Sequence, residues 1–282
     1  MDFSPCKLAM EIGAMIDVEP YRISPGSVVE LQDISTREKG GLSKKQGKKA
    51  VNKLSKRLVE LQELLYAESK HSLLIIFQAM DAGGKDSTTR RVFWRLDPSG
   101  IKVKSFKAPT QREQRQDFLW RIHHHAPRSG HIAIFNRSQY EDVVAARVRG
   151  LESLNICQSR FEHINAFERL LVSEGTVVLK FFLHISKDYQ RERLQRRLDR
   201  PDKHWKFAPS DLKDREHWGD FMQAYSEAIE HCSGSDTPWY VVPAERRWYR
   251  DLVVLQATVN ALESLNMSYP QADFNPDDIE IV

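Results

Sequence analysis

A glycine-rich turn between an apolar run and a helical pattern constrains the fold most strongly. Residues Leu73–Phe77 are apolar and of strand length, and the sequence AMDAGGKDST, residues 79–88, follows them closely. Apolar residues then recur at helical spacing over residues 92–96. Gly83 and Gly84 have no Cβ, so backbone N–H groups can close on phosphate oxygens beside the positive end of the new helix. The segment therefore predicts a strand, a phosphate-binding loop and a helix.

This loop departs at two positions from the common phosphate-loop pattern G-x-x-x-x-G-K-S/T. Ala79 occupies the first glycine position and Asp86 occupies the hydroxyl position, whereas Lys85 supplies the expected ammonium group. The alternative is an ordinary glycine-rich turn that carries a solvated lysine. We predict that this loop binds phosphate.

The composition is that of a soluble globular chain, with 41% hydrophobic and 29% charged residues among 282. No window approaches 18 apolar residues, and the N-terminus has no secretory pattern, so we expect a cytoplasmic protein without a membrane partner. Its three cysteines are scattered and odd in number, which argues against a disulfide framework or a metal knuckle. The net charge of +3 conceals basic runs at residues 44–57, 112–121 and 187–206, which favour an anionic ligand.

Short apolar runs alternate with amphipathic stretches along most of the chain. The runs are Leu73–Phe77, Val103–Phe106, Ile132–Phe135, Val177–Ile185 and Trp239–Val242. Such alternation predicts an α/β fold with a parallel sheet covered on both faces. Residues 44–67 show helical periodicity. We expect an irregular N-terminal extension (1–42) that wraps one domain (43–270), followed by a C-terminal tail (271–282).

Three of the predicted strands end in polar residues, at Asp81, at Lys107 and at Asn136–Asp142. Ligands of such sheets bind beyond the carboxyl ends of the strands. Asn136 stands where a carboxylate usually holds Mg²⁺, and Glu141 or Asp142 could compensate. Arg137 could stabilise charge on a transferring phosphoryl group. The alternative is a polar strand cap with a surface ion pair.

The most basic segment, residues 187–206, predicts a helix with Ser186 as N-cap and Pro201 as its end. Arginines recur at spacings of three and four and share one face, at positions Arg193, Arg196, Arg197 and Arg200. Such a row is similar to the lid that closes over phosphates in kinases. The alternative is a salt-bridged surface helix. Trp205 is predicted to anchor this segment to the core rather than to stack on a base.

Three consecutive histidines, His123 to His125, do not predict a metal site, because successive residues of a helix point about 100° apart. The same stretch predicts a helix with a packed apolar face and two exposed arginines. The apolar residues are Phe118, Leu119, Trp120 and Ile122, and the arginines are Arg115 and Arg121.

Seven blocks of this sequence together resemble the family-2 polyphosphate kinases. They are AMDAGGKDST (79–88), SFKAPT (105–110), DFLWR (117–121), FNRSQYED (135–142), FFLHISK (181–187), RLDRPDKHWK (197–206) and PWYVVPA (238–244). They occur in the family's order over about residues 20–265. The resemblance implies a P-loop-kinase-like three-layer αβα sandwich, with a five-stranded parallel sheet and a helical lid near residues 187–208.

It also implies Mg²⁺-dependent, reversible phosphoryl transfer between inorganic polyphosphate and nucleotides. By position, Asp81, Lys85 and Arg137 would be catalytic, and Asp81 and Glu141 would be candidate Mg²⁺ ligands. The implied phosphate- and nucleotide-binding residues are Ala82, Gly83, Gly84, Asp86, Ser87, Thr88, Arg90, Lys107, Asn136, Glu141, Arg193, Arg196, Arg197, Arg200 and Lys203. Asn136 and the Ala-Pro pair after the second strand are similar to the subgroup that phosphorylates AMP as well as ADP.

Two other functions remain open at this point. An ATP-dependent nucleoside monophosphate kinase shares the loop, sheet and lid, but Asp81 and the surplus of basic residues disfavour it. A polyanion-binding protein with a degenerate loop fits the changes at Ala79 and Asp86. Aromatic residues do not alternate with the basic ones, so nucleic acid is not an expected partner. The expected partners are polyphosphate, ADP, AMP, ATP and further copies of this chain, as a dimer or tetramer.

Overall fold

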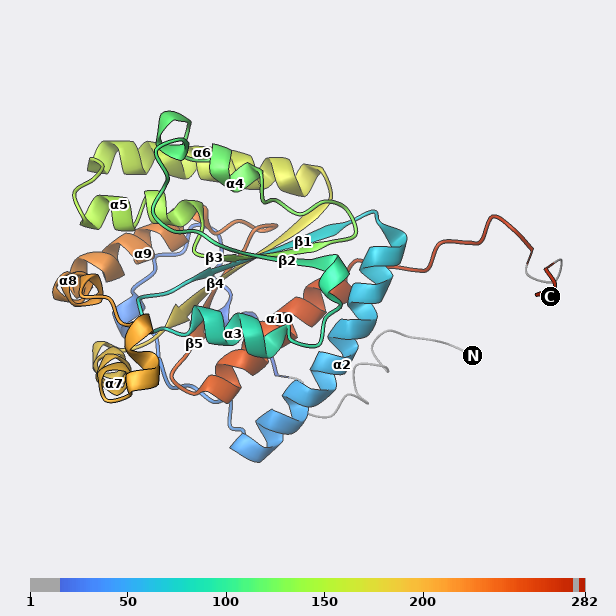
Figure 1. The fold of residues 1–282 in the computed structure, drawn as a ribbon, viewed down its shortest axis with the longest axis horizontal. Helices are drawn as coiled ribbons and strands as arrows, with labels where there is room; N and C mark the ends of the chain where they lie inside the picture. The colour runs from blue at the N-terminus through green and yellow to red at the C-terminus, as the bar shows by residue number, and fades with distance from the viewer. Residues whose placement is uncertain (1–15, 276–278, 282) are drawn as a thin grey trace.

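The computed structural model describes residues 16–275 and 279–281. At its centre lies a sheet of five parallel strands in the order β2-β3-β1-β4-β5 (Figure 1). The strands are β1 (Ser72–Gln78), β2 (Ile101–Ser105), β3 (Ile132–Asn136), β4 (Thr176–His184) and β5 (Trp239–Pro243). All five predicted strands are confirmed, with ends within two residues of the apolar runs. The apolar runs of β1, β3, β4 and β5 identify them because these four strands, unlike β2, are buried on both faces.

Helices cover both faces of the sheet, and this confirms the predicted three-layer αβα arrangement (Figure 1). One face carries α2 (Lys44–Glu68), α3 (Lys85–Val92) and α10 (Arg247–Glu263). The other carries α4 (Trp120–His123), α5 (Ala145–Val148), α6 (Leu154–Ser173) and α9 (Trp218–Cys232). Short 3₁₀ helices complete the connections: η1 (Glu19–Tyr21), η2 (Leu31–Asp33), η3 (Pro98–Gly100), η4 (Glu113–Arg115) and η5 (Gln139–Asp142).

Burial differs between the two edges of the sheet. Every residue of the edge strand β5 is buried, as in the inner strands β1 and β3, whereas the opposite edge strand β2 leaves Val103 53% exposed. Strand β1 is central, and the chain runs from it first towards β2 and β3 and later back across to β4 and β5. The carboxyl end of β1 is therefore the topological switch point, where open α/β sheets bind their ligands.

The basic segment 187–206 forms two elements at the carboxyl edge of the sheet, α7 (Lys187–Leu198) and η6 (Pro201–Lys206), and α8 (Ser210–Glu216) follows them (Figure 1). Ser186 is the N-cap of α7 and accepts a hydrogen bond from the Tyr189 amide at 3.1 Å. Pro201 opens η6, because a proline without an N–H fits the first position of a new helix. The predicted cap is confirmed, and Pro201 lies beyond the helix as predicted. However, α7 already ends at Leu198, so the prediction that Arg200 shares one helical face with the other arginines is wrong.

The N-terminal residues 16–42 follow the outer edge of the sheet beside β5. The Ile23 amide donates to the Trp239 carbonyl at 2.8 Å, and Arg22 forms an antiparallel bridge with Tyr240. Val29 and Leu31 are buried in the same hydrophobic core as the sheet. This stretch therefore protects an edge strand that would otherwise expose unpaired backbone groups.

The prediction around residues 115–123 is partly wrong. The helix is a single turn, α4, and Arg121 is buried rather than exposed. Its guanidinium donates to the Lys107 carbonyl at 2.8 Å and pairs with Asp142 at 3.2 Å. Helical periodicity could not show this, because both partners lie in other segments of the chain. Arg115 is exposed, as predicted.

Candidate active site

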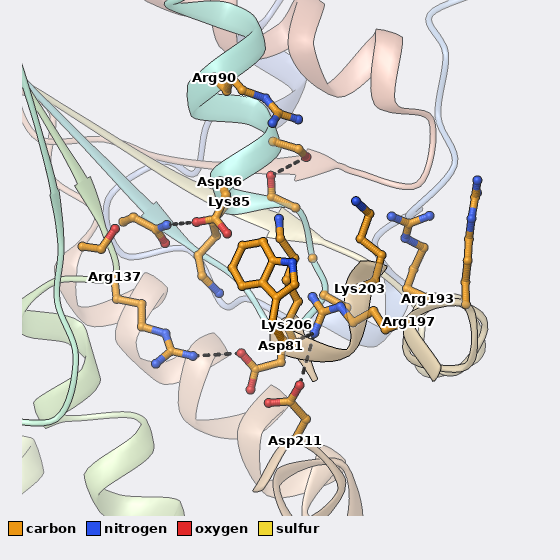
Figure 2. A pocket seen from close by; sticks show the side chains of 18 of the residues that line it. Asp81, Lys85, Asp86, Arg90, Arg137, Arg193, Arg197, Lys203, Lys206 and Asp211 are labelled. Atoms are coloured by element: carbon orange, nitrogen blue, oxygen red, sulfur yellow. Dashed lines mark hydrogen bonds and ion pairs between the residues drawn. The ribbon is translucent and has the colours of Figure 1, made fainter. Parts of the chain in front are cut away.

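A cavity of about 650 Å³ opens at the carboxyl edge of the sheet (Figure 2). Five segments meet there: the loop after β1, the ends of β2 and β3, the segment 193–211 and the start of α10. Of the eighteen predicted site residues, all but Thr88 and Glu141 line it. Residues that sequence reasoning missed also line it, namely Ser105, Phe106, Trp205, Lys206, Asp211 and Arg247.

The turn before α3 requires its two glycines. A Cβ on Gly83 would lie 2.7 Å from the Ala79 Cβ and 2.9 Å from the Met80 carbonyl oxygen. Gly84 has φ +104°, and a Cβ there would lie 2.2 Å from the guanidinium of the buried Arg250. Ala82 also adopts a positive φ, of 64°. A non-glycine residue held in this region stores strain that surrounding contacts must offset, and such strain is concentrated at functional sites.

Lys85 begins α3, and its ammonium group is held inside the loop. The residue is 9% exposed, and its Nζ donates to the Ala79 carbonyl at 2.7 Å. Burial lowers the pKa of Lys85, and the nearby charge of Arg137 lowers it further, although Asp81 and Asp86 oppose both effects. The ammonium is thus a desolvated charge fixed beside the loop, where its effect on a bound phosphate is larger than in water.

Asp81 and Arg137 connect the ends of β1 and β3 (Figure 2). The guanidinium lies 2.8 Å from the carboxylate. Burial would raise the pKa of Asp81, but the charges of Lys85 and Arg137 outweigh it and hold the pKa below its usual value. Arg137 has φ +61°, and its amide donates to the Phe77 carbonyl at 3.0 Å. Asp81 therefore faces the cavity ionised, and its cationic partner has a defined orientation.

The remaining loop side chains have different environments. Asp86 accepts a hydrogen bond from the Asn136 amide, so this carboxylate joins the start of α3 to the end of β3 (Figure 2). Ser87 lines the cavity. Thr88 is fully buried, and its hydroxyl donates to the Gly84 carbonyl at 3.0 Å, so it does not face the cavity.

The two acidic residues that follow β3 lie outside the cavity lining. Asp142 pairs with Arg121, and burial raises its pKa even though Arg121 opposes the shift. Glu141 acts on the site through charge, because together with Asp81 it raises the pKa of Arg137 against the effect of burial. Among the residues that the structure describes, no group of three or more His, Cys, Asp and Glu could hold a metal ion.

Arginines of α7, together with Arg200 in the turn before η6, form the opposite wall of the cavity. Arg197 pairs with Asp211 at 3.2 Å, and Arg200 pairs with Asp202 at 3.0 Å. Within the described residues, Arg193 and Arg196 have no carboxylate at ion-pair distance. Burial lowers the pKa of Arg193, and the neighbouring Arg247 and other arginines lower it further. Cations placed together without counterions favour an anionic ligand between them.

A hydrogen bond connects this wall to the phosphate loop. Gln190, a buried residue of α7, donates from its side-chain amide to the Asp81 carbonyl at 3.0 Å. Arg215 contacts the same glutamine and the Lys187 carbonyl. A change in the position of α7 is therefore transmitted to the backbone that carries Asp81. Sequence reasoning missed Gln190, because a glutamine on a helix gives no indication of which backbone group it will meet.

The cavity as a whole is strongly basic. Eleven of its lining residues are lysine or arginine, and three are aspartate, which leaves a formal excess of eight positive charges. The whole chain carries only +3. The cavity is therefore much more positive than the chain as a whole, which favours a polyanion at this edge of the sheet.

The prediction for Trp205 is wrong. This tryptophan does not anchor η6 to the core, because it is 76% exposed and lines the cavity. Trp205 lies in η6, after the turn at Pro201, and therefore outside the helix whose periodicity could be read from the sequence.

The fold and the site define a P-loop-kinase-like phosphotransferase, with a phosphate loop at the switch point and a basic wall across the cavity. Comparison with known proteins specifies the group. Residues 41–270 match the model of the family Polyphosphate kinase 2 (PPK2). The chain belongs to this family, as the seven sequence blocks predicted.

Two relatives and one solved structure are similar to this chain over almost their whole length. The chain is 49% identical to the AMP/ADP-polyphosphate phosphotransferase of Meiothermus ruber, over 91% of this chain and 97% of the relative. It is 40% identical to the ADP-polyphosphate phosphotransferase of Rhodopseudomonas palustris, over 91% and 93%. The crystal structure of Polyphosphate Kinase 2 from Arthrobacter aurescens superposes with a TM-score of 0.88 at 42% identity, over 92% of this chain and 93% of that one.

Proposed function

We propose that this chain is a phosphotransferase that moves phosphoryl groups reversibly between inorganic polyphosphate and nucleotides, with ADP and AMP as acceptors. The observation that carries the proposal is the cavity in which the phosphate loop faces a wall of arginines, with eleven basic side chains around one space. A linear polyanion needs a basic groove more than it needs shape recognition. The names of the Meiothermus and Rhodopseudomonas relatives support the same reaction.

The reaction joins a nucleotide to the end of the polymer. A terminal phosphate oxygen of ADP or AMP attacks the end phosphorus of polyphosphate, the bridging P–O bond breaks, and the shortened polymer leaves with the electron pair. Lys85 and Arg137 stabilise the charge that develops on the transferring group, because their cations are fixed and partly desolvated at the loop. Asp81, ionised and held by Arg137, orients the acceptor phosphate.

The acidic residues of the loop suit Mg²⁺. This ion is usually bound by one or two carboxylates together with substrate phosphates and water, rather than by an all-protein cage. Asp81 and Asp86 are two carboxylates on the cavity wall, and the described residues contain no larger acidic cluster. Asp81 and Asp86 would hold the ion, and Glu141, which does not line the cavity, is not our first choice. When bound, Mg²⁺ would neutralise part of the phosphate charge.

An ATP-dependent nucleoside monophosphate kinase is the second candidate, because it needs the same loop and lid. The length of the basic wall favours polyphosphate, since it continues from Arg193 on α7 to Lys206 at the end of η6 and to Arg247 on α10. We assign residues 187–208 to the lid and residues 43–270 to the catalytic domain, in accord with the range of the family match.

One assay tests the proposal. Purified protein is incubated with Mg²⁺, long-chain polyphosphate and either ADP or AMP, and ATP and ADP formation are measured. A parallel reaction replaces polyphosphate with ATP and supplies AMP as acceptor. We expect transfer from polyphosphate to both nucleotides. Transfer from ATP alone would instead establish the nucleoside monophosphate kinase.

We also propose a cytoplasmic homo-oligomer. Cys157 and Cys232 are buried free thiols, as suits a reducing compartment. No helix in the described part of the chain has the length and apolar character to cross a membrane. The exposed edge strand β2, with Val103, offers a surface that further copies could cover. Light scattering coupled to size-exclusion chromatography would give the number of copies.

A further inference from the structure

The residues that line the cavity explain how phosphates could bind, but most of them offer no surface for a nucleobase. Its lining is dominated by lysine and arginine, whereas a base is a flat, neutral aromatic ring. In the described part of the chain, two aromatic side chains line the cavity, Phe106 and Trp205. Phe106 is buried and packs edge-on against Phe135 at 5.0 Å between centroids. Trp205 is thus the aromatic side chain of the lining with an accessible ring.

Trp205 is exposed, yet its ring is held in one orientation. The indole Nε1 donates to the Asp202 carbonyl at 3.1 Å, within the same 3₁₀ helix. The His204 ring and the Leu198 carbonyl, 2.8 Å apart, connect η6 to the end of α7. Arg197 donates to the Lys206 carbonyl at 3.1 Å. A large apolar ring that is fixed and solvated at the same time is prepared for a partner, because tryptophan is usually well buried.

One face of the Trp205 indole already contacts a cation. The Lys206 ammonium lies 4.7 Å from the ring centroid, a cation–π contact. Because Trp205 remains 76% exposed in spite of this contact, its other face is open. Lys203 and Lys206 flank the tryptophan in sequence and also line the cavity. A ring beside two phosphate-binding cations matches the layout of a nucleotide, in which a base and phosphates are joined through a ribose.

We propose that Trp205 is the stacking platform for the nucleobase of the acceptor nucleotide. The inference rests on the proposed function, since it assigns the base subsite of the same cavity. The base takes the face of the indole opposite Lys206, and the phosphates extend from there towards Lys85. A purine overlaps an indole more than a pyrimidine does, so ADP gains more from the contact than CDP. Trp205 is accordingly a specificity-determining residue that acts on nucleotide binding and not on polyphosphate.

The test compares three variants, Trp205→Ala, Trp205→Phe and Trp94→Ala. Trp94 is the matched control, because it is also exposed (65%) and lies under a cation, Arg95 at 4.8 Å, but does not line the cavity. Calorimetry measures the dissociation constants of ADP, CDP and tripolyphosphate, which has phosphates without a base. Kinetics measure KM for ADP and for polyphosphate.

We expect Trp205→Ala to weaken ADP binding by about 10-fold or more, the scale of a lost base–aromatic stack. CDP binding should weaken less, and tripolyphosphate binding should not change. Trp205→Phe should restore most of the ADP affinity, and Trp94→Ala should match the wild type. Equal weakening of ADP and tripolyphosphate would overturn the proposal in favour of a role in shaping the lid, and unchanged ADP affinity would overturn it outright. If Trp205→Ala selectively lost ADP binding but the wild-type protein showed no polyphosphate-dependent transfer, the proposed function would be rejected. The proposal that Trp205 stacks on the base would still hold.

Discussion

The phosphate loop and the lid both present cations to the cavity, but they are built in opposite ways. In the loop, Lys85 is almost fully buried, and its ammonium is bonded to a backbone carbonyl. In the lid, Arg196 is exposed and Arg193 is half-buried, and neither has a carboxylate partner among the described residues. The loop is therefore ordered before any ligand arrives. We propose that the lid arginines gain their partners from the ligand.

This difference indicates that the loop and the lid have different functions in the reaction. A fixed, desolvated charge stabilises a transition state without reorganisation at the moment of reaction. Exposed arginines carry about 2 kcal/mol of rotamer entropy each, which they lose when phosphates order them. Such side chains suit capture and closure rather than the chemical step. The comparison predicts large effects on turnover for changes in the loop and smaller, binding-related effects for changes in the lid.

Lys85→Ala should have the largest effect. Removing the fixed cation at the transferring group should lower kcat on the order of 10²–10³-fold, the scale of losing one preorganised stabilising group. Circular dichroism should show a folded protein, so that the loss reports on chemistry. A folded variant with wild-type turnover would remove Lys85 from the site and with it the idea of a preorganised loop.

Asp81→Asn should follow, with a fall in kcat of about 10²-fold. The amide keeps the size of the side chain but removes the charge that pairs with Arg137 and would hold Mg²⁺. Titration of activity with Mg²⁺ separates the two roles, because a lost ligand shifts the Mg²⁺ requirement upward. If activity survived at normal Mg²⁺, Asp81 would be a turn residue, and Asp86 would become the leading carboxylate.

Replacing Arg193, Arg196 and Arg197 together by glutamine tests the lid. Glutamine keeps helix propensity but removes three charged donors to phosphate, so we expect kcat/KM to fall about 10- to 100-fold. The control is Arg191→Gln, a neighbouring exposed arginine of α7 outside the cavity lining, which should leave kcat/KM unchanged. Equal activity of triple and control variants would mean that α7 carries only a surface ion-pair array, whose exposed pairs are worth well under about 1 kcal/mol each.

Salt should produce the smallest effect, and it should separate the two substrates. A polymer that contacts many cations loses affinity steeply as salt rises, because each neutralised phosphate had released counterions. We expect KM for polyphosphate to rise more steeply with KCl concentration than KM for ADP. The slope should become shallower in the triple lid variant and stay unchanged in Lys85→Ala, whose cation is shielded from solvent. If KM rose equally with KCl concentration for both substrates, the proposal that the lid binds the polymer through many cations would be contradicted.

Much of the fold was predictable from the sequence, because it depends on local patterns. The runs that formed β1 and β3 are continuous apolar segments, and Ser186 and Pro201 mark helix ends by chemistry that needs no distant partner. The same applies to Gly83 and Gly84, whose positions in the turn follow from the space that a Cβ would need. Most of the candidate site was found through these segments, since parallel strands deliver their ends to one edge.

What the sequence left open are contacts between segments far apart in the chain. Arg121 appeared solvated until its partners Lys107 and Asp142 were known, and Gln190 gave no sign of its bond to the Asp81 carbonyl. Trp205 appeared to belong to the core. In each case the side chain's direction depends on how a turn or a short helix is placed, which propensity does not encode. The sequence by itself determined the sheet, the phosphate loop and the basic character of the site. Only the tertiary structure decided which charges are paired, which are free for a ligand, and which aromatic ring faces it, because pairing and exposure are properties of surfaces brought together by folding.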